Sequence, residues 1–371
     1  MRLSFCSLLV LLLGACSSRE ERVENREADW YPISNAHARC FRILVRGDER
    51  QLVVLGAGGS TDTLAVYRVK STKDTSREGT ADPIVLPVLD RVAVISTTHL
   101  PFISALGRAS AVVGAAHLND VRDTALLACI KRGSVQEIAT ADGLDRERLI
   151  SLAPQALLDY PFGRTNTTQG NAGPMRIEVT EYMEQDPLGR AEWIRFFGVL
   201  FGEEVKADSI FKAIELRYTT VRDMAKVIPQ HPKVFFGSAW QGQWFVPPGN
   251  SYVGQLITDA GGAYCYAEQK ADGNITLDLE TVLAQARNAQ HFGVVLASAG
   301  RVGLADLSGG DKRIAALDAV RRGGFYLDSQ RSDVFGAALL EPDQLLMDLR
   351  CIFHPRYCGD REPKYAFALG Q

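Results

Sequence analysis

Three short polar segments of the sequence carry side chains that suit the capture of a small molecule. They span residues 96–99, 160–162 and 240–244, and each follows an apolar run of strand length. Aromatic rings offer flat apolar faces, while hydroxyl, carboxamide and imidazole groups add directional hydrogen bonds. This combination suits a large conjugated ligand such as a macrocycle or a catecholate. The candidate ligand-binding residues are Thr97, Thr98, His99, Tyr160, Phe162, Trp240, Gln243 and Trp244.

Each candidate also has a structural alternative. Thr97 and Thr98 could instead cap a helix, and either tryptophan ring could pack in a core. A lone histidine such as His99 is usually structural, and no histidines and carboxylates accompany it at metal-ligand spacing. We therefore predict no metal site and no resident cofactor. Arg331 is a further candidate that would neutralise an anionic chelate, with a solvated surface arginine as the alternative.

Strands that alternate with helices must position these segments. The apolar runs predict strands at residues 92–95, 112–114, 234–236 and 294–296 and helices at 101–106, 187–201, 252–260 and 343–352. Such alternation predicts parallel sheets covered by helices, with ligands outside the carboxyl ends of the strands. Residues 237–250, rich in Trp, Gln, Pro and Gly, are predicted to form a loop.

A long helical pattern near the middle of the chain divides it into two lobes. Residues 203–228 contain no internal Gly or Pro, and Pro229 ends the pattern. We expect an N-terminal α/β lobe at 40–202, a connecting helix at 203–229 and a C-terminal α/β lobe at 230–371. Residues 40–70 alternate apolar and polar side chains, which predicts extra antiparallel strands. Glu181 and Arg190 flank a Pro-Leu-Gly turn, and we expect them to fix the start of the helical region, with contact to the ligand as the alternative.

Composition limits the classes of protein that fit. The 371 residues are 46% hydrophobic and 23% charged, which allows about two globular domains. A formal net charge of -3 lacks the basic excess expected of a nucleic-acid-binding protein.

The first sixteen residues predict a lipid anchor. A basic start and an apolar run too short to span a bilayer end in Leu-Gly-Ala-Cys, which resembles the bacterial lipoprotein box. We expect a signal peptide at 1–15, a lipidated Cys16 and a polar tether at 16–39, with the body in the cell envelope facing the periplasm or extracytoplasmic space. The alternative is an ordinary secretory signal with an incidental cysteine.

Outside the cytoplasm the compartment is oxidising, which allows disulfides to form. Cys351 and Cys358 flank a proline, and we expect that they either form a disulfide or leave Cys351 free and buried.

Four segments resemble one protein family. They are residues 91–99 (RVAVISTTH) with 105–107 and 112–114, then 181–194 (EYMEQDPLGRAEWI), 248–262 (PGNSYVGQLITDAGG) and 346–355 (LMDLRCIFHP). Together they are similar to the periplasmic binding proteins, in part lipoproteins, of importers for iron-siderophores, haem and vitamin B12. One departure is residues 329–336 (SQRSDVFG), where relatives often carry a Gly/Asn-rich loop with an aromatic pair and an acid.

The resemblance implies two Rossmann-like lobes joined by one long helix, with a ferric siderophore, haem or cobalamin held between them. It also implies as partners a dimeric membrane permease with its cytoplasmic ATPase. The chain carries no GxSxG, HExxH or P-loop motif, so we do not expect an enzyme. The alternatives are a structural or accessory envelope lipoprotein and an extracytoplasmic hydrolase.

Overall fold

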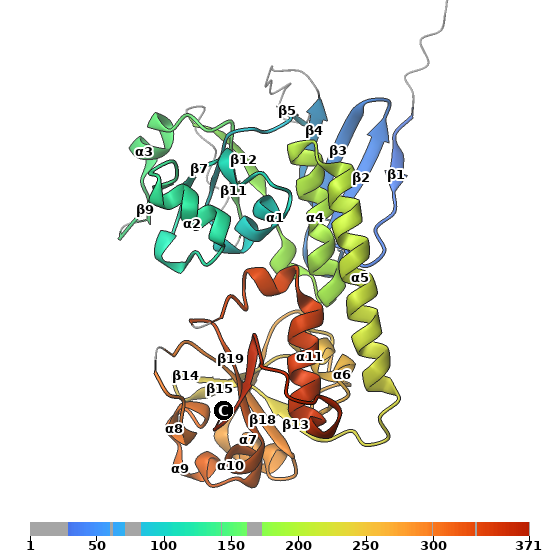
Figure 1. Ribbon diagram of the computed structural model, residues 1–371, viewed down its shortest axis with the longest axis vertical. Helices are drawn as coiled ribbons and strands as arrows, with labels where there is room; N and C mark the ends of the chain where they lie inside the picture. Colours follow the sequence, from blue (N-terminus) through green and yellow to red (C-terminus); the bar gives the residue numbers. More distant parts are fainter. Residues whose placement is uncertain are drawn as a thin grey trace, which may run out of the picture.

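Two parallel β-sheets, one in each lobe, form the framework of the protein. The computed structural model describes residues 29–370 apart from 60–61, 71–82, 142, 162–172, 299 and 331. The lobes lie at the two ends of a long helix, with an additional sheet beside the N-terminal lobe (Figure 1). This arrangement confirms the predicted fold class, two α/β lobes joined by one helix and preceded by a β-rich segment.

The sheet of the N-terminal lobe has the order β12-β11-β6-β7-β8, and its neighbouring strands are all parallel. The carboxyl ends of its strands therefore share one edge. Its strands are β6 (Val92–Val94), β7 (Val112–Ala115), β8 (Gln136–Glu137), β11 (Ala156–Asp159) and β12 (Met175–Glu178), and its helices are α1 (Leu100–Ala105), α2 (Thr124–Lys131) and α3 (Arg146–Ser151).

The sheet of the C-terminal lobe has the order β16-β13-β18-β19-β20, and only β20 is antiparallel to its neighbour. Its strands are β13 (Lys233–Phe236), β16 (Ala263–Tyr264), β18 (His291–Leu296), β19 (Gly324–Asp328) and β20 (Ala366–Ala368). Its helices are α6 (Tyr252–Asp259), α7 (Leu279–Ala286), α8 (Leu304–Leu307), α9 (Lys312–Ala315), α10 (Asp318–Gly323) and α11 (Pro342–Phe353).

The helix that joins the lobes, α5 (Glu204–Lys226), packs as a hairpin against the helix before it, α4 (Pro187–Phe201). Asp186 caps the first turn of α4, and Gly202 ends this helix with a φ of 66°, a conformation that glycine adopts without strain. The chain then reverses into α5, which at 1.5 Å per residue is roughly 35 Å long. Along α5 the chain leaves α4 and packs against α11 of the C-terminal lobe (Figure 1).

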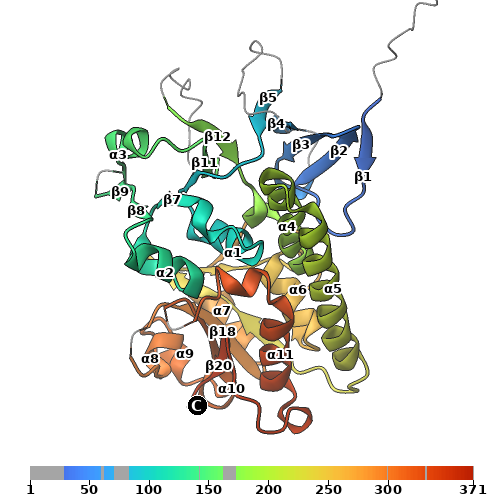
Figure 2. The same cartoon turned by 45° about the horizontal axis from the view of Figure 1, so that its top comes forward.

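The N-terminal segment forms a five-stranded sheet that packs against α4, as the two views agree (Figure 2). Its buried ring Phe41 lies 4.8 Å from Trp193 of α4, edge to face. Its strands, in spatial order, are β1 (Tyr31–Ile33), β2 (Phe41–Arg46), β3 (Glu49–Leu55), β4 (Thr63–Lys70) and β5 (Ile84–Pro87).

The remaining elements are short. Two small sheets complete the lobes. The N-terminal lobe has a two-stranded sheet of β9 (Ala139–Thr140) and β10 (Gly143–Leu144), and the C-terminal lobe has a three-stranded sheet of β14 (Ser238–Trp240), β15 (Gln243–Val246) and β17 (Ile275–Leu277). The 3-10 turns are η1 (Ala57–Gly59), η2 (Thr97–His99), η3 (Ala109–Ala111), η4 (Leu118–Asp120), η5 (Glu181–Met183), η6 (Ala337–Leu339) and η7 (Pro355–Tyr357).

The structure corrects one element of the sequence analysis. Residues 237–250 do not form a loop throughout, because β14 and β15 pair as a hairpin across Gln241 and Gly242. Both turn residues have positive φ, 51° and 79°, as a two-residue hairpin turn requires.

The structure joins Cys351 and Cys358 in a disulfide, with a Cα–Cα distance of 5.4 Å. Within the described part of the chain, no helix has both the length and the apolar composition needed to cross a bilayer.

Candidate functional site

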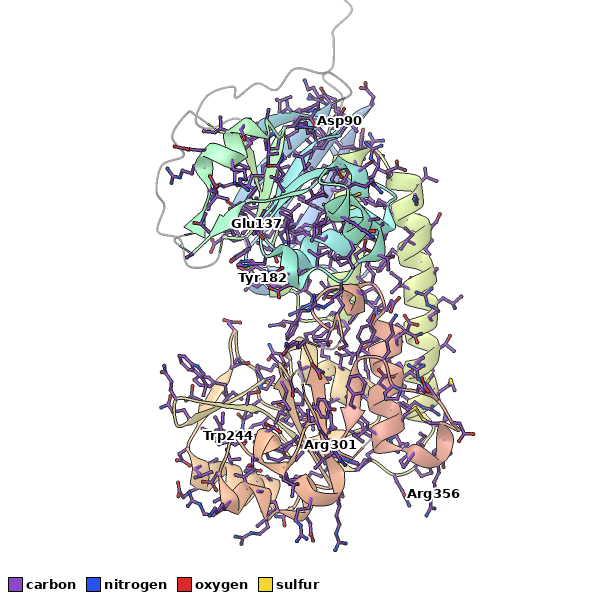
Figure 3. All side chains as sticks on the ribbon, turned by 60° about the vertical axis from the view of Figure 1, so that its left-hand side comes forward. Asp90, Glu137, Tyr182, Trp244, Arg301 and Arg356 are labelled. Carbon is purple, nitrogen blue, oxygen red and sulfur yellow. A yellow bond between two sulfur atoms is a disulfide. The ribbon has the colours of Figure 1, made fainter. Side chains whose placement is uncertain are left out.

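The candidate site of the N-terminal lobe lies where β6, β11 and β12 end. Because these strands are parallel neighbours, the segments that follow them meet at one edge of the sheet. Thr97, Tyr160 and Tyr182 come from these three segments, and each is half-buried. Figure 3 shows Tyr182 on the side of this lobe that faces the C-terminal lobe.

A buried carboxylate holds the segment after β6 in place. The Thr98 hydroxyl donates a hydrogen bond to Oε1 of Glu181 over 2.5 Å, and Nε2 of His99 lies 3.3 Å from Oε2. Burial opposes the charged form of Glu181, but the nearby His99 and these hydrogen bonds keep the pKa of its carboxyl below the usual value. Glu181 therefore positions the segment after β6, a role different from the predicted one at the start of its own helical region.

The structure corrects the assignment of His99 as a ligand-binding residue. Its side chain is fully buried and packs beside Phe197 of α4. A ligand outside the strand ends has no access to this ring. Thr98 is half-buried, but its hydroxyl is already engaged by Glu181 and by Ser96. Thr97 is the member of this segment that remains a candidate.

Tyr182 is a further candidate that the sequence analysis missed. Its ring lies 6.3 Å from that of Tyr160, edge to face, so the two rings form one aromatic surface. Burial raises the pKa of Tyr182 to about 12. Its buried hydroxyl has no hydrogen-bond partner among the described residues, which leaves a donor for a ligand. The only signal in the sequence was an aromatic residue directly after Glu181.

The C-terminal lobe contributes the hairpin of β14 and β15. Trp240 is 62% exposed, and its ring lies 6.2 Å between centroids from that of Phe245 on the same hairpin. Gln243 pairs with Trp240 across the hairpin and is also exposed. An exposed indole beside a carboxamide can stack on a flat ligand and donate a hydrogen bond to it.

The same strand register places the Trp244 side chain on the other face of the hairpin, away from the candidate site. Trp244 pairs with Ala239, one position along the hairpin, so its ring lies on the opposite face from Trp240. It is 4% exposed and packs edge to face against Phe235 and Phe292. Trp244 is therefore a core residue of the C-terminal lobe, and its assignment to ligand binding is wrong.

Three further predictions lie outside the described residues: the lipidated Cys16, the site residue Phe162 and the site residue Arg331. A search of the described residues finds no cluster of three His, Cys, Asp or Glu side chains that could hold a metal ion.

Contacts between the lobes fix how the two halves of the site are oriented. The Arg190 guanidinium donates hydrogen bonds to the backbone carbonyls of Tyr182 and Glu184, and it stacks 4.2 Å from the ring centroid of Tyr252 on α6. On α5, the Tyr218 hydroxyl donates to Asp259 at the end of α6 over 2.7 Å. One half-buried arginine thus holds the backbone of Tyr182 and touches the opposite lobe.

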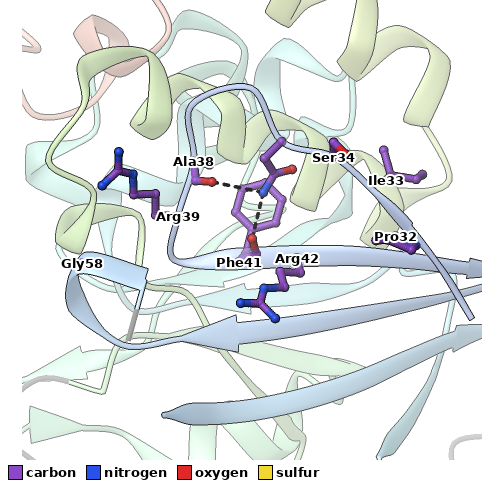
Figure 4. A pocket seen from close by; sticks show the side chains of 9 residues that line it. Pro32, Ile33, Ser34, Ala38, Arg39, Phe41, Arg42 and Gly58 are labelled. Carbon is purple, nitrogen blue, oxygen red and sulfur yellow. Dashed lines mark hydrogen bonds between the residues drawn. The ribbon is translucent and has the colours of Figure 1, made fainter. Parts of the chain in front are cut away.

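A second hollow, of about 380 Å³, lies on the N-terminal sheet (Figure 4). It is lined by Pro32, Ile33, Ser34, Asn35, Ala38, Arg39, Phe41, Arg42 and Gly58.

Comparisons with known proteins agree with this architecture. Residues 92–320 match the family described as periplasmic binding protein. Two uncharacterized lipoproteins of Methanocaldococcus jannaschii are similar to this chain: one is 24% identical over 75% of this chain and 68% of its own length, the other 23% identical over 90% and 86%.

Solved structures share the fold. A periplasmic heme binding protein from Pseudomonas aeruginosa is 17% identical, with a TM-score of 0.55 over 76% of this chain and 98% of its own. The siderophore binding protein FhuD from Vibrio cholerae, with bound Fe3+-Desferal, is 19% identical, with a TM-score of 0.53 over 71% and 98%. With more than half of its residues matched, and with two α/β lobes on a helical backbone, the chain belongs to the periplasmic binding protein family.

Proposed function

We propose that this protein is the substrate-binding lipoprotein of an ABC importer and captures a metal chelate between its two lobes. The ligand class is a ferric siderophore, haem or a cobalamin. The observation that carries the proposal is the placement of aromatic and hydroxyl side chains at the strand ends, with Trp240 on one lobe and Thr97, Tyr160 and Tyr182 on the other.

The chemistry of these groups favours a flat or conjugated ligand. Aromatic rings on both sides supply apolar stacking surfaces, and the Tyr182 hydroxyl and Gln243 carboxamide supply hydrogen bonds. The family supports the ligand class, since its structural neighbours include proteins described as binding heme and Fe3+-Desferal.

The contacts of Arg190 and Tyr218 support a binding site whose shape exists before the ligand arrives. A preformed site loses little conformational entropy on binding. The delivery partners would be the permease dimer, one lobe against each subunit, and its cytoplasmic ATPase. We infer no catalytic role, in keeping with a family of binding proteins.

The lipid anchor is part of this proposal. The Leu-Gly-Ala-Cys box and the similarity to two archaeal lipoproteins support acylation of Cys16 in the cell envelope. Cys16→Ser is expected to release the protein from membranes or block its processing. Unchanged membrane fractionation together with an unchanged mature mass would refute the anchor.

Tryptophan fluorescence tests ligand capture directly. Titration with haemin, ferrioxamine and cyanocobalamin should quench the exposed Trp240 at saturation by one chelate per chain. Trp240→Phe keeps a stacking ring and should retain binding while losing most of the quenching. If no chelate changes the emission or binds by calorimetry, the protein is an accessory envelope lipoprotein; turnover of a chromogenic ester or glycoside would indicate a hydrolase instead.

A further inference from the structure

The N-terminal sheet precedes the part of the chain that the family match covers. The family match begins at residue 92, whereas β1 to β5 end at Pro87. The neighbours align with 71–76% of this chain but with 98% of two of their own chains. The archaeal lipoprotein that aligns over 90% of this chain must share part of this sheet. The sheet is therefore an addition to the part of the chain that the family match covers.

Two buried carboxylates fasten the sheet rigidly to the helical backbone. Glu192 of α4 accepts hydrogen bonds from the backbone N–H groups of Ala36, His37 and Ala38 over 2.8–2.9 Å. Glu184 accepts those of Arg39 and Cys40 over 2.7–3.0 Å. Hydrogen bonds to charged groups are among the stronger ones in proteins. The sheet therefore holds the lobes at a fixed orientation relative to whatever the sheet binds.

The hollow on this sheet carries two arginines without partners. Among the described residues, neither the Arg39 nor the Arg42 side chain has an ion pair or a hydrogen bond, and both are exposed at the hollow beside Phe41 (Figure 4). Among the other basic groups of the sheet, Arg46 and Lys70 pair with Glu49 and Arg50 pairs with Glu204, while Arg68 stacks on the Trp30 ring away from the hollow's lining residues. A pair of free guanidinium groups is suited to a phosphate or a carboxylate.

Other groups at the hollow narrow the chemistry of its ligand. The Asn35 amide donates to the carbonyls of Ala38 and Phe41, while its buried Oδ1 accepts nothing from the described residues. That oxygen can accept a hydrogen bond from a hydroxyl or N–H group that a ligand carries next to its phosphate or carboxylate. Tyr31 and Ile33 on the edge strand β1 are 65% and 40% exposed. The hollow thus combines two guanidinium groups, an acceptor and the exposed Ile33, and Tyr31 lies two residues away on the same strand.

We propose that this hollow binds the headgroup of an anionic phospholipid and seats the N-terminal sheet on the bilayer. A phosphodiester would pair with Arg39 and Arg42, and a headgroup hydroxyl would donate to Asn35, as phosphatidylglycerol can. Tyr31 and Ile33 would reach the interface between headgroups and acyl chains. The proposal rests on the lipid anchor of the proposed function, because only fourteen residues separate Cys16 from Tyr31, and the fifteen Cα–Cα steps between them span at most roughly 54 Å.

Quenching of Trp30 by lipids spin-labelled at the headgroup tests the proposal. Trp30 lies on the sheet, stacked under Arg46 and Arg68, whereas Trp240 lies on the C-terminal lobe. The acylated full-length protein is placed in nanodiscs of phosphatidylcholine with or without phosphatidylglycerol, and its acylation is first confirmed by mass. We expect stronger quenching with phosphatidylglycerol, and we expect Trp30→Phe to remove this difference.

Variants that remove positive charge distinguish headgroup binding in the hollow from a general attraction of the protein to a negatively charged membrane. Arg39→Gln with Arg42→Gln should reduce the quenching to its value in phosphatidylcholine, whereas Arg313→Gln, an exposed arginine of the other lobe, should leave it unchanged. Melting temperatures and chelate affinities of the variants should equal those of the parent. Equal quenching in both membranes, or full quenching retained in the double variant, would overturn the proposal.

A soluble competitor identifies the source of the phosphate. If glycerol 3-phosphate binds the hollow as tightly as phosphatidylglycerol does, the occupant is a soluble phosphate ester and the proposal is wrong. An unacylated parent would instead refute the anchor of the proposed function, so the two failures are distinguishable.

Discussion

The guanidinium of Arg190 on α4 lies 4.2 Å from the ring centroid of Tyr252 at the start of α6. This stack joins the helical backbone to the C-terminal lobe, and the same guanidinium binds the backbone carbonyl of Tyr182 at the edge of the N-terminal lobe. A single side chain therefore links the orientation of the lobes to the position of a proposed ligand-binding residue.

Arg190→Ala should destabilise the protein by about 2–3 kcal/mol, because two carbonyls lose a charged donor and Tyr252 loses its stacked cation. Tyr252→Leu keeps the hydrogen bonds and should cost less, about 1–2 kcal/mol. Urea denaturation of both variants and of the double variant measures the coupling between the residues. Additive effects would show that the stack contributes nothing.

Trp240 and Trp244 should behave in opposite ways. Trp244→Ala removes a buried ring and should destabilise the protein by about 3–5 kcal/mol. Trp240→Ala removes an exposed ring and should leave the melting temperature within a few degrees, yet weaken chelate binding by about 2 kcal/mol, or roughly 30-fold. Calorimetric melting and titration of each variant distinguish the two roles. Loss of stability in Trp240→Ala would contradict its assignment to the surface.

The sequence predicted the architecture well because apolar runs and helix caps are local signals. The strand at 92–94, the helix at Pro187–Phe201 and its long successor follow from hydrophobic periodicity and from Pro and Gly at helix ends. The hairpin at 238–246 escaped prediction, since its positive-φ turn is Gln-Gly rather than the more typical Asn-Gly.

Site residues were harder to predict, because their role depends on which face of an element is covered. Trp240 and Trp244 look alike in the sequence, and only the strand register separates an exposed ring from a buried one. His99 ends a polar segment, yet its side chain is buried beside Glu181, which lies far along the chain. The orientation of Tyr182 likewise depends on Arg190.

His37 makes stability depend on pH. Its Nδ1 lies 3.2 Å from Asp186 and its Nε2 lies 2.8 Å from Glu215, and chiefly the hydrogen bond to Asp186 raises the pKa of His37 to about 9. A raised pKa in the folded state stabilises the protein fully below about pH 6.5, and this contribution is lost as the pH rises toward 9.

Between about pH 6.5 and 9 we expect the free energy of unfolding of the parent to fall by about 1–2 kcal/mol, after allowance for solvent screening at a partly exposed site. His37→Gln should show a flatter profile in urea denaturation at pH 6 to 9. An identical slope in parent and variant would contradict the charged state of His37.

The disulfide between Cys351 and Cys358 closes a short loop after α11. Constraining such a loop in the unfolded chain stabilises the folded state by about 2–3 kcal/mol in the entropic account. The double variant Cys351→Ser with Cys358→Ser should therefore have a lower melting temperature than the oxidised parent. Its melting temperature should equal that of the reduced parent. Tryptic peptides mapped without reduction should contain the linked pair, and two separately alkylated thiols would refute the bond.

Native mass spectrometry of the protein mixed with haemin, ferrioxamine and cyanocobalamin tests the central claim most directly. The expected spectrum shows one chelate bound per chain, in lower yield for Trp240→Ala and in unchanged yield for Arg313→Gln. A spectrum of the unliganded chain alone, from folded protein offered all three chelates, would contradict capture of a metal chelate between the lobes.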